Sequence, residues 1–359
     1  MSVKSTRRQA VAAACVATWF LLAGSSQASA QRQQPKLDDA ERAEAQELVN
    51  LVEKASAGDA AGTGLTLTWG QHYFIKAQGE KTYVPFTVAV TADTPVNSAV
   101  GFYLRVVARS TLTGATDGGA APAAKREDTS KAAAPEFAFE DLYFFDLPGA
   151  APGQPRRVSR AFAVPPGDYD IYVAIKERAS RAAKDATPRS GVLRQSLTVP
   201  EFNTPGLKVS SVIVAERIDM LETPIDPESQ AEHPFTFGQM QITPAAELKF
   251  SKKDELTLVF WIYGAQNDPA TKKPNVQVEY KFHQIKDGGE TYFNRTEPQL
   301  LNAETLPPQF DLAVGHQLSG SLAVGLTSFP EGDYRLAIEV QDKAASAQAT
   351  TDVKFTVVP

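Results

Sequence analysis

Hydrophobic residues alternate with polar or small residues in two stretches that lie roughly half a chain apart. The first runs from Val164 to Ile175 and the second from Phe329 to Val340, and a turn of Pro, Gly and Asp opens each of them. The alternating apolar residues are Tyr169, Ile171, Val173 and Ile175 in the first stretch, and Tyr334, Leu336, Ile338 and Val340 in the second. A two-residue period is typical of a half-buried β-strand. The sequence therefore predicts two related β modules.

The boundaries of the modules follow from breaks in this pattern. The first module is predicted to span residues 65–202 and the second residues 203–359, because the run from Pro200 to Gly206 is rich in turn-forming residues. Residues 110–134 are mostly Gly, Ala, Thr and Lys without periodicity, and strand-like alternation resumes after them. They are predicted to form a mobile loop inserted in the first module.

The placement of Tyr169 and Tyr334 carries a family resemblance. Each tyrosine follows a Gly-Asp pair at the start of a late strand, which resembles the tyrosine corner of immunoglobulin-like and fibronectin type III-like sandwiches of exported bacterial proteins. The resemblance implies an all-β fold of two tandem sandwiches, with both tyrosine hydroxyls bonded to upstream backbone. It implies little about activity, since such sandwiches serve in adhesion, sugar binding, chaperoning and spacing.

An amphipathic stretch precedes the first module. Residues 37–55 are predicted to form a helix, because Pro35 precedes them, acidic residues occupy the first turn and Gly58 follows the end. This helix belongs to a segment, 31–64, that also contains a Gly- and Ala-rich link. The narrow apolar stripe favours a helix that packs on the first module or tethers the chain. The alternative is a partner-binding or coiled-coil segment.

The first 30 residues have the pattern of a signal peptide. Basic residues precede an apolar run at 10–23, and Ala28 and Ala30 give the small-residue cleavage pattern. Cleavage near Ala30 predicts an exported protein, periplasmic or extracellular. The paired arginines at 7 and 8 leave a twin-arginine signal open as an alternative, and Cys15 leaves a lipoprotein open. The apolar run is too short for a membrane-spanning helix, and no other stretch is long enough.

Charge and cysteine content narrow the class of partner. The chain has 36 Lys and Arg against 42 Asp and Glu, and three of the basic residues lie in the predicted signal. A diffuse acidic balance argues against nucleic acid and against an anionic membrane surface as partner. Cys15 is the only cysteine, so each predicted sandwich depends on its own core without the disulfide of antibody domains.

Catalytic and metal-binding patterns are weak. The four histidines lie in separate segments without metal-ligand spacing, and neither a GxSxG elbow nor a Gly-rich phosphate loop occurs, so no metal, cofactor or enzyme activity is predicted. The one candidate for hydrolysis is the carboxylate group of Glu140, Asp141 and Asp146, among aromatic residues. The alternative interpretation makes these carboxylates solvent-facing neighbours of core residues.

Two aromatic strips are candidate binding sites. In residues 256–263 one face of the predicted strand is core, and the opposite face carries Val259, Trp261 and Tyr263. A strand apolar on both faces is covered on both, either by a neighbouring loop or the other module, or by a partner or a sugar ring stacked on Trp261 and Tyr263. The second strip consists of Phe139, Tyr143 and Phe145.

Together these patterns predict a non-catalytic, exported binding or scaffolding protein of the bacterial cell envelope. Its predicted partner is another envelope protein. A carbohydrate-binding protein is the first alternative, and a carboxylate-dependent hydrolase is the second.

Overall fold

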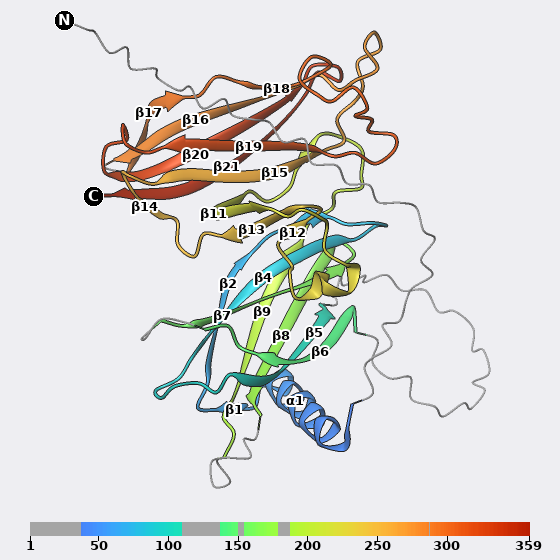
Figure 1. The fold of residues 1–359 in the computed structure, drawn as a ribbon, viewed down its shortest axis with the longest axis vertical. Coiled ribbons are helices and arrows are strands. Elements are labelled where there is room, and N and C mark those ends of the chain that lie inside the picture. Colours follow the sequence, from blue (N-terminus) through green and yellow to red (C-terminus); the bar gives the residue numbers. More distant parts are fainter. Residues whose placement is uncertain (1–36, 110–136, 150–153, 179–186, 287) are drawn as a thin grey trace, which may run out of the picture. The chain divides into compact units, whose positions relative to one another are not determined.

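The structure is a computed structural model that describes residues 37–109, 137–149, 154–178, 187–286 and 288–359. The predicted signal peptide and the predicted insert at 110–134 lie outside these residues. The described chain divides into two compact units between Asn203 and Thr204. Both units are built of β-sheets, and the only α-helix of the described residues lies at the N-terminal end (Figure 1). The predicted all-β fold class, with its short N-terminal helix, is confirmed.

The first unit consists of two sheets. One sheet has the order β1-β9-β8-β5-β6, and in the other β4 pairs with β2, β3 and β7. The strands are β1 (Gly62–Thr63), β2 (Thr66–His72), β3 (Ile75–Lys76), β4 (Thr82–Thr91), β5 (Ala99–Ala108), β6 (Phe139–Asp146), β7 (Arg156–Val164), β8 (Gly167–Glu177) and β9 (Ser190–Val199). Every strand pair in both sheets is antiparallel.

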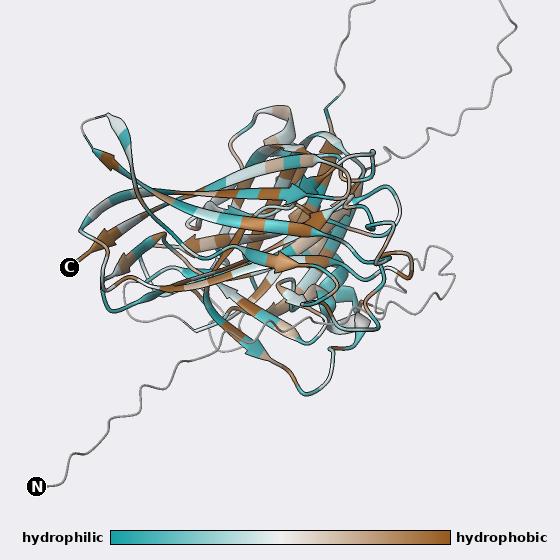
Figure 2. Cartoon of the chain, turned by 90° about the horizontal axis from the view of Figure 1, so that it is seen from above, coloured by the Kyte–Doolittle hydropathy of each residue, from teal (hydrophilic) through white to brown (hydrophobic). Residues whose placement is uncertain are grey.

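The core of the first unit lies between these two sheets. Alternate residues of β4, β5, β7 and β8 are buried and belong to one hydrophobic cluster. Many strands of the chain carry alternating hydrophobic and hydrophilic bands in Figure 2. Phe86 and Phe162 pack there with ring centroids 5.9 Å apart. The period of two therefore supplies one buried face per sheet, which is the requirement for a sandwich.

Helix α1 (Asp39–Ala57) covers part of the outer face of the β5–β8 sheet (Figure 1). Asp38 caps the helix and forms a capping box with Glu41. Leu48 and Val52 are fully buried, and the cluster that they join also contains Tyr103, Tyr172 and Ala174 of β5 and β8. Ion pairs from Lys176 and Arg178 to three glutamates of the helix, Glu41, Glu44 and Glu47, surround this contact. The helix is therefore packed on the first unit, as the first of the two interpretations predicts.

Gly101 of β5 allows this close approach of helix and sheet. A Cβ atom at Gly101 would lie 2.8 Å from Cδ1 of Leu48 and 3.1 Å from the Phe144 ring. We expect Gly101→Val to displace helix α1 and to destabilise the unit by about 1–3 kcal/mol, since overpacking forces neighbours to move. Hydrogen exchange should quicken across residues 39–57 and stay slow in β4 and β8. Gly149→Val is the matched control, because a Cβ there meets nothing within 4 Å; helix amides equally protected in both variants would contradict this role of Gly101.

The second unit also consists of two sheets. One has the order β10-β15-β11-β13-β12 with β19 paired to β15, and the other has the order β14-β21-β20-β16-β17 with β18 paired to β16. The strands are β10 (Lys208–Val209), β11 (Ile213–Met220), β12 (Thr236–Phe237), β13 (Met240–Pro244), β14 (Lys249–Ser251), β15 (Glu255–Tyr263), β16 (Val276–Lys286), β17 (Gly289–Arg295), β18 (Gln299–Leu301), β19 (Leu318–Gly325), β20 (Gly332–Asp342) and β21 (Ala347–Val358), with a 3-10 helix, η1, at Pro227–Ala231. The inner faces of both sheets contribute to one core cluster.

Both units share one strand plan. In the first unit, β4 pairs with β2 and β7, β5 pairs with β6 and β8, and β8 pairs with β9. In the second unit, β15 takes the place of β4 and pairs with β11 and β19. There β16 takes the place of β5 and pairs with β17 and β20, and β20 takes the place of β8 and pairs with β21. The last residues of β8 and β20, Glu177 and Asp342, pair with Val100 and Val276 respectively. These pairs align the two copies residue by residue.

The two conspicuous tyrosines occupy equivalent positions in the two units. The Tyr169 hydroxyl donates to the backbone oxygen of Pro165 at 2.9 Å, and the Tyr334 hydroxyl donates to that of Pro330 at 2.8 Å. Each bond spans four residues and joins the start of a strand to the preceding turn. Both units therefore contain the corner contact that the resemblance implies.

The outer faces of the corresponding sheets differ between the copies. The alignment places Glu279 where the first unit has Tyr103, and Glu339 where it has Ala174. Both glutamates form ion pairs with Lys281. A charged face of this kind has no apolar surface to bury, which explains why the helix covers the first copy.

Candidate functional site

The strip of Val259, Trp261 and Tyr263 is buried. Trp261 is 3% exposed, and Val259 and Tyr263 are each less than one tenth exposed. Phe237 of β12 packs on Trp261 with ring centroids 4.7 Å apart, and the Trp261 backbone N–H donates to the Ser210 hydroxyl oxygen at 2.9 Å. The second face of β15 is therefore covered by the chain itself. In this arrangement the Trp261 and Tyr263 side chains are covered, so a sugar ring or a partner would reach them only after the covering residues moved.

The strip of Phe139, Tyr143 and Phe145 lies on β6, at the end of its sheet. All three side chains are half-buried and pack against the core cluster of the first unit. The ring centroids of Tyr143 and Phe145 lie 6.0 Å and 6.1 Å from that of Phe102. The ring centroid of Phe139 lies 6.2 Å from that of Phe162. These three rings therefore close the sandwich at its edge rather than stand free on its surface.

A buried arginine lies beside these rings. Arg160 of β7 places its guanidinium carbon 4.0 Å from the Phe145 ring centroid and 4.8 Å from that of Tyr143. One of its terminal nitrogens donates to the Ser159 backbone oxygen at 2.8 Å. An arginine stacked on aromatic rings keeps its charge close to favourable ring faces. The sequence repeat places Gly320 at this position of the second unit, where a Cβ would lie 2.1 Å from the Phe260 ring, so the arginine is particular to the first copy.

The three carboxylates of β6 do not form a pair. Glu140 and Asp141 are adjacent in a strand, so their side chains point to opposite faces of the sheet. Glu140 accepts a hydrogen bond from the Tyr103 hydroxyl and forms an ion pair with Arg105 at 3.3 Å. Burial and the acceptor Glu140 raise the pKa of Tyr103, which keeps its hydroxyl protonated. A hydrolase of the glycosidase type needs two facing carboxyl groups, and this arrangement does not supply them.

Asp141 is held on the other face of β6. It accepts a hydrogen bond from the Tyr143 hydroxyl at 2.5 Å and one from the backbone N–H of Leu142 at 2.9 Å. Asp146 is exposed at the end of the strand. The predicted carboxylate group is therefore divided among three separate surroundings.

The edge strand differs sharply between the two copies. β6 is a continuous strand of 8 residues with five aromatic or aliphatic side chains. The second unit has the short strands β17 and β18 in its place, because Leu301 pairs with Val276 as Phe145 pairs with Val100. β17 is mostly exposed and polar, and its pairing with β16 shifts register at Phe282 and His283. A broken, polar edge is typical of natural protection against strand pairing, and β6 lacks it.

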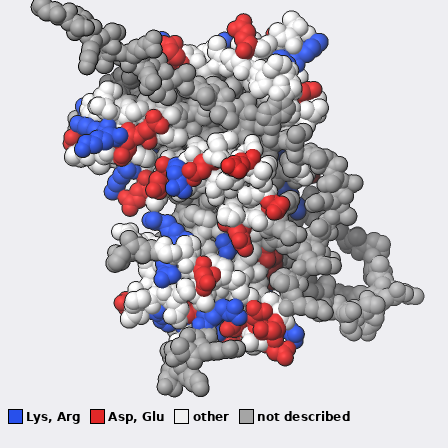
Figure 3. Space-filling view, viewed as in Figure 1, with Lys and Arg blue, Asp and Glu red and all other residues white. Residues whose placement is uncertain are grey.

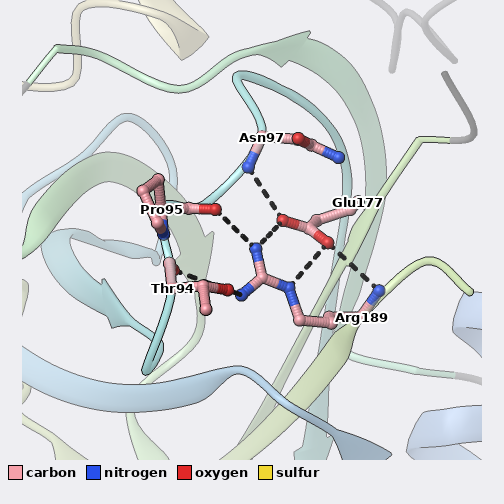
Figure 4. Close-up of polar contacts among 5 residues, drawn as sticks. All are labelled: Thr94, Pro95, Asn97, Glu177 and Arg189. Carbon is pink, nitrogen blue, oxygen red and sulfur yellow. Dashed lines mark hydrogen bonds and ion pairs between the residues drawn. The ribbon is translucent and has the colours of Figure 1, made fainter. Parts of the chain in front are cut away.

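A buried carboxylate at the end of the equivalent strands β8 and β20 has no signature in the local sequence pattern. Glu177 accepts hydrogen bonds from the backbone N–H groups of Asn97 at 2.8 Å and Arg189 at 3.2 Å, and from two side-chain nitrogens of Arg189 (Figure 4). Arg189 also donates to the backbone oxygens of Thr94 and Pro95. We call the group of Glu177, Arg189 and residues 94–97 the carboxylate clamp. It ties the loop between β4 and β5 to the start of β9.

The second unit has a related contact. Asp342, aligned with Glu177, is fully buried and accepts from the backbone N–H groups of Gln266 at 2.8 Å and Ala344 at 2.9 Å. No arginine corresponds to Arg189 in these contacts.

The charge of Glu177 is stabilised by its partners in the clamp. Burial alone would raise the pKa of Glu177, but the hydrogen bonds and charge of Arg189 outweigh it and hold that pKa below its ordinary value.

Within the described ranges, no group of three or more His, Cys, Asp or Glu residues is arranged to hold a metal ion. The same residues contain no helix long and apolar enough to cross a membrane. On the face shown in Figure 3, acidic and basic groups are interspersed.

Comparisons with known proteins assign no family to the chain. No family model and no curated protein sequence matches it. Among solved structures, trypsin-activated alpha-2-macroglobulin from Escherichia coli is 11% identical, with a TM-score of 0.22 over 83% of this chain and 17% of that one. Alpha-2-macroglobulin from Salmonella, reacted with methylamine, is 13% identical, with a TM-score of 0.22 over 82% of this chain and 16% of that one. Red sea bream transglutaminase is 11% identical, with a TM-score of 0.19 over 91% of this chain and 34% of that one. The chain thus spans a small part of these proteins, and the likeness assigns it no activity.

Proposed function

We propose that this chain is an exported, non-catalytic binding protein of the bacterial cell envelope, and that it contacts another protein through strand β6. Export rests on the signal pattern of the first 30 residues. The observation that carries the binding role is the continuous, half-exposed aromatic edge strand of the first unit. The second copy has the same strand plan but an interrupted, polar edge, so folding alone does not require an apolar one.

The alternatives have less support. Stacking of a sugar on Trp261 would require Phe237 to leave its place, because the ring is only 3% exposed. Hydrolysis would require a second carboxylate facing Glu140, whereas Asp141 projects from the opposite face of the strand. Contact with a protein requires neither change.

Site-specific photo-crosslinking tests the proposal. A photoreactive residue replaces Glu140 or Asp146 on β6 in the full chain, which is then irradiated in cells of the source organism. We expect a discrete adduct with one envelope protein from each β6 position, because both residues lie at the exposed edge. The matched control carries the same residue at Thr291, which is exposed on β17. Absence of adducts at β6, or equal adducts at Thr291, would overturn the proposal.

A further inference from the structure

The backbone of β6 presents hydrogen-bonding groups on the side opposite β5. Among the residues that the structure describes, β5 is the only strand that pairs with β6. The backbone N–H of Leu147 donates to the Ser98 oxygen at 2.7 Å, on the β5 side. Backbone N–H groups alternate between the two edges of a strand, so those of Glu140, Leu142, Phe144 and Asp146 point away from β5.

We propose that β6 binds its partner by strand addition, and that the partner segment is an extended peptide of alternating apolar and basic residues. This inference rests on the proposed binding role of β6 and specifies its mechanism. In strand addition, main-chain hydrogen bonds supply affinity, and contacts to alternate side chains supply specificity. The length of β6, 8 residues, accommodates several such main-chain bonds.

The charges of β6 select the partner. Its sequence contains Glu140, Asp141 and Asp146 and no basic residue. Glu140 remains 44% exposed in its side chain although it pairs with Arg105. Opposite charges on neighbouring strands stabilise a sheet and like charges destabilise it. A basic segment therefore fits this edge, whereas a second copy of β6 would bring three more acidic side chains to the edge and no basic one.

Asp141 makes the site selective. Its carboxylate already accepts from the Leu142 N–H on the outer edge, at 2.9 Å. An inward-pointing charge of this kind discourages indiscriminate pairing at a sheet edge. A basic side chain on the incoming segment draws this carboxylate away and releases the Leu142 N–H for the new strand. An acidic or purely apolar segment provides no such compensation.

Hydrogen exchange with designed peptides tests strand addition on the full mature chain. The probe is an eight-residue peptide alternating valine and lysine, with capped ends. We expect it to slow exchange of the Phe144 and Asp146 amides, and expect two comparison peptides not to: one with glutamate in place of lysine, and one N-methylated along a single edge. Protection by the glutamate peptide, or no protection at β6 up to about 1 mM lysine peptide, would overturn the proposal.

A matched pair of variants distinguishes the contribution of the Phe144 backbone N–H to binding from that of the Phe144 ring. Phe144→Pro removes the outward N–H together with the ring, and Phe144→Ala removes the ring alone. Because proline is tolerated where an edge N–H faces solvent, both variants should keep the fold, as checked by thermal unfolding. We expect Phe144→Pro to weaken binding of the lysine peptide about tenfold and Phe144→Ala less than about threefold. Equal affinities of the two variants would contradict strand addition.

The outcomes distinguish this inference from the proposed function. Crosslinks from Glu140 and Asp146 that persist unchanged in Phe144→Pro would leave β6 as a protein-binding site and exclude strand addition. Self-association of the chain through β6, measured by sedimentation, would replace the basic partner with a second copy. Absence of crosslinks from Glu140 and Asp146 in the chain that keeps Phe144 would remove both proposals.

Discussion

Glu177→Ala is expected to lower the free energy of unfolding of the first unit by about 3–5 kcal/mol, because removal of one partner from a buried ion pair leaves the other without compensation. The Glu177 side chain is 4% exposed and accepts from Arg189 and from the Asn97 backbone. Loss of the carboxylate also leaves Arg189 without the acceptor that orients it, and Arg189 is the side chain that holds the backbone of Thr94 and Pro95 (Figure 4). Chemical denaturation, followed through hydrogen exchange of β4 and β8, measures the change.

The control for this prediction is a single exposed ion pair in the second unit. Arg217→Ala removes an exposed ion pair with Asp219, and exposed pairs contribute only about 0.2–1 kcal/mol. A Glu177→Ala variant no less stable than Arg217→Ala would show that the clamp contributes little to stability.

The clamp also makes stability depend on pH. The pKa of Glu177 in the folded state lies below its ordinary value, so the folded state binds this proton more weakly than the unfolded chain does. The stabilisation is therefore complete above the unfolded pKa of about 4.3 and disappears as the pH falls through the lowered folded pKa. We expect the stability difference between wild type and Glu177→Gln to shrink between neutral and strongly acidic pH. A difference that stays constant would contradict a charged clamp.

Tyr334→Ala is expected to destabilise the second unit by about 3–5 kcal/mol, since it empties a large buried site. The Tyr334 ring is fully buried and stacks on Phe355 with centroids 5.3 Å apart, and Phe329 lies edge-on at 5.4 Å. Tyr334→Phe keeps these contacts and loses the bond to the Pro330 oxygen, so it should cost about 1 kcal/mol. Denaturation of the two variants separates the ring from the hydroxyl.

The same substitution can be compared at the two equivalent tyrosine corners. Tyr169→Phe loses the same type of bond in the first unit and should cost a similar free energy of unfolding there. Tyr292→Ala, at a side chain that is 55% exposed, should change stability by less than about 0.5 kcal/mol. A Tyr334→Phe variant as unstable as Tyr334→Ala would mean that the hydroxyl, and not the ring, dominates the corner.

Local patterns were sufficient to predict the strands that carry the two tyrosine corners, whereas β6, β17 and β18 were not predicted as strands. Alternation places Tyr334 and Leu336 on one face whatever the neighbours are, because successive side chains point to opposite faces. The turn residues before each tyrosine limit the backbone enough to predict the corner. The helix was predicted at 37–55 and is found at Asp39–Ala57, since caps and acidic first-turn residues act within a few positions of each other.

Matching by sequence failed where the copies diverged in their edges. Phe145, Asp146 and Leu147 resemble Phe310, Asp311 and Leu312 in order and type. Pairing with the neighbouring strand nevertheless aligns Phe145 with Leu301. A register is defined by hydrogen bonds to another strand. Pro298 marks the interruption between β17 and β18, but it does not indicate which residues of β16 each of these strands pairs with.

The candidate site required the tertiary structure for the same reason. A strand that is apolar on both faces indicates that something covers the second face, but the segment that supplies Phe237 lies more than twenty positions from Trp261. The carboxylate clamp joins Thr94, Glu177 and Arg189, which have no common local pattern. Only folding brings such distant groups within hydrogen-bond distance.

From its residues alone, this chain determined a duplicated β architecture, a helix ahead of it and two tyrosine corners, because each depends on steric and hydrogen-bonding preferences within a few neighbouring positions. The tertiary structure decided that Trp261 is covered, that the β6 carboxylates point apart and that one copy alone keeps a continuous aromatic edge. These properties depend on which distant segment occupies each face, and that is settled by packing and strand register rather than by local preference.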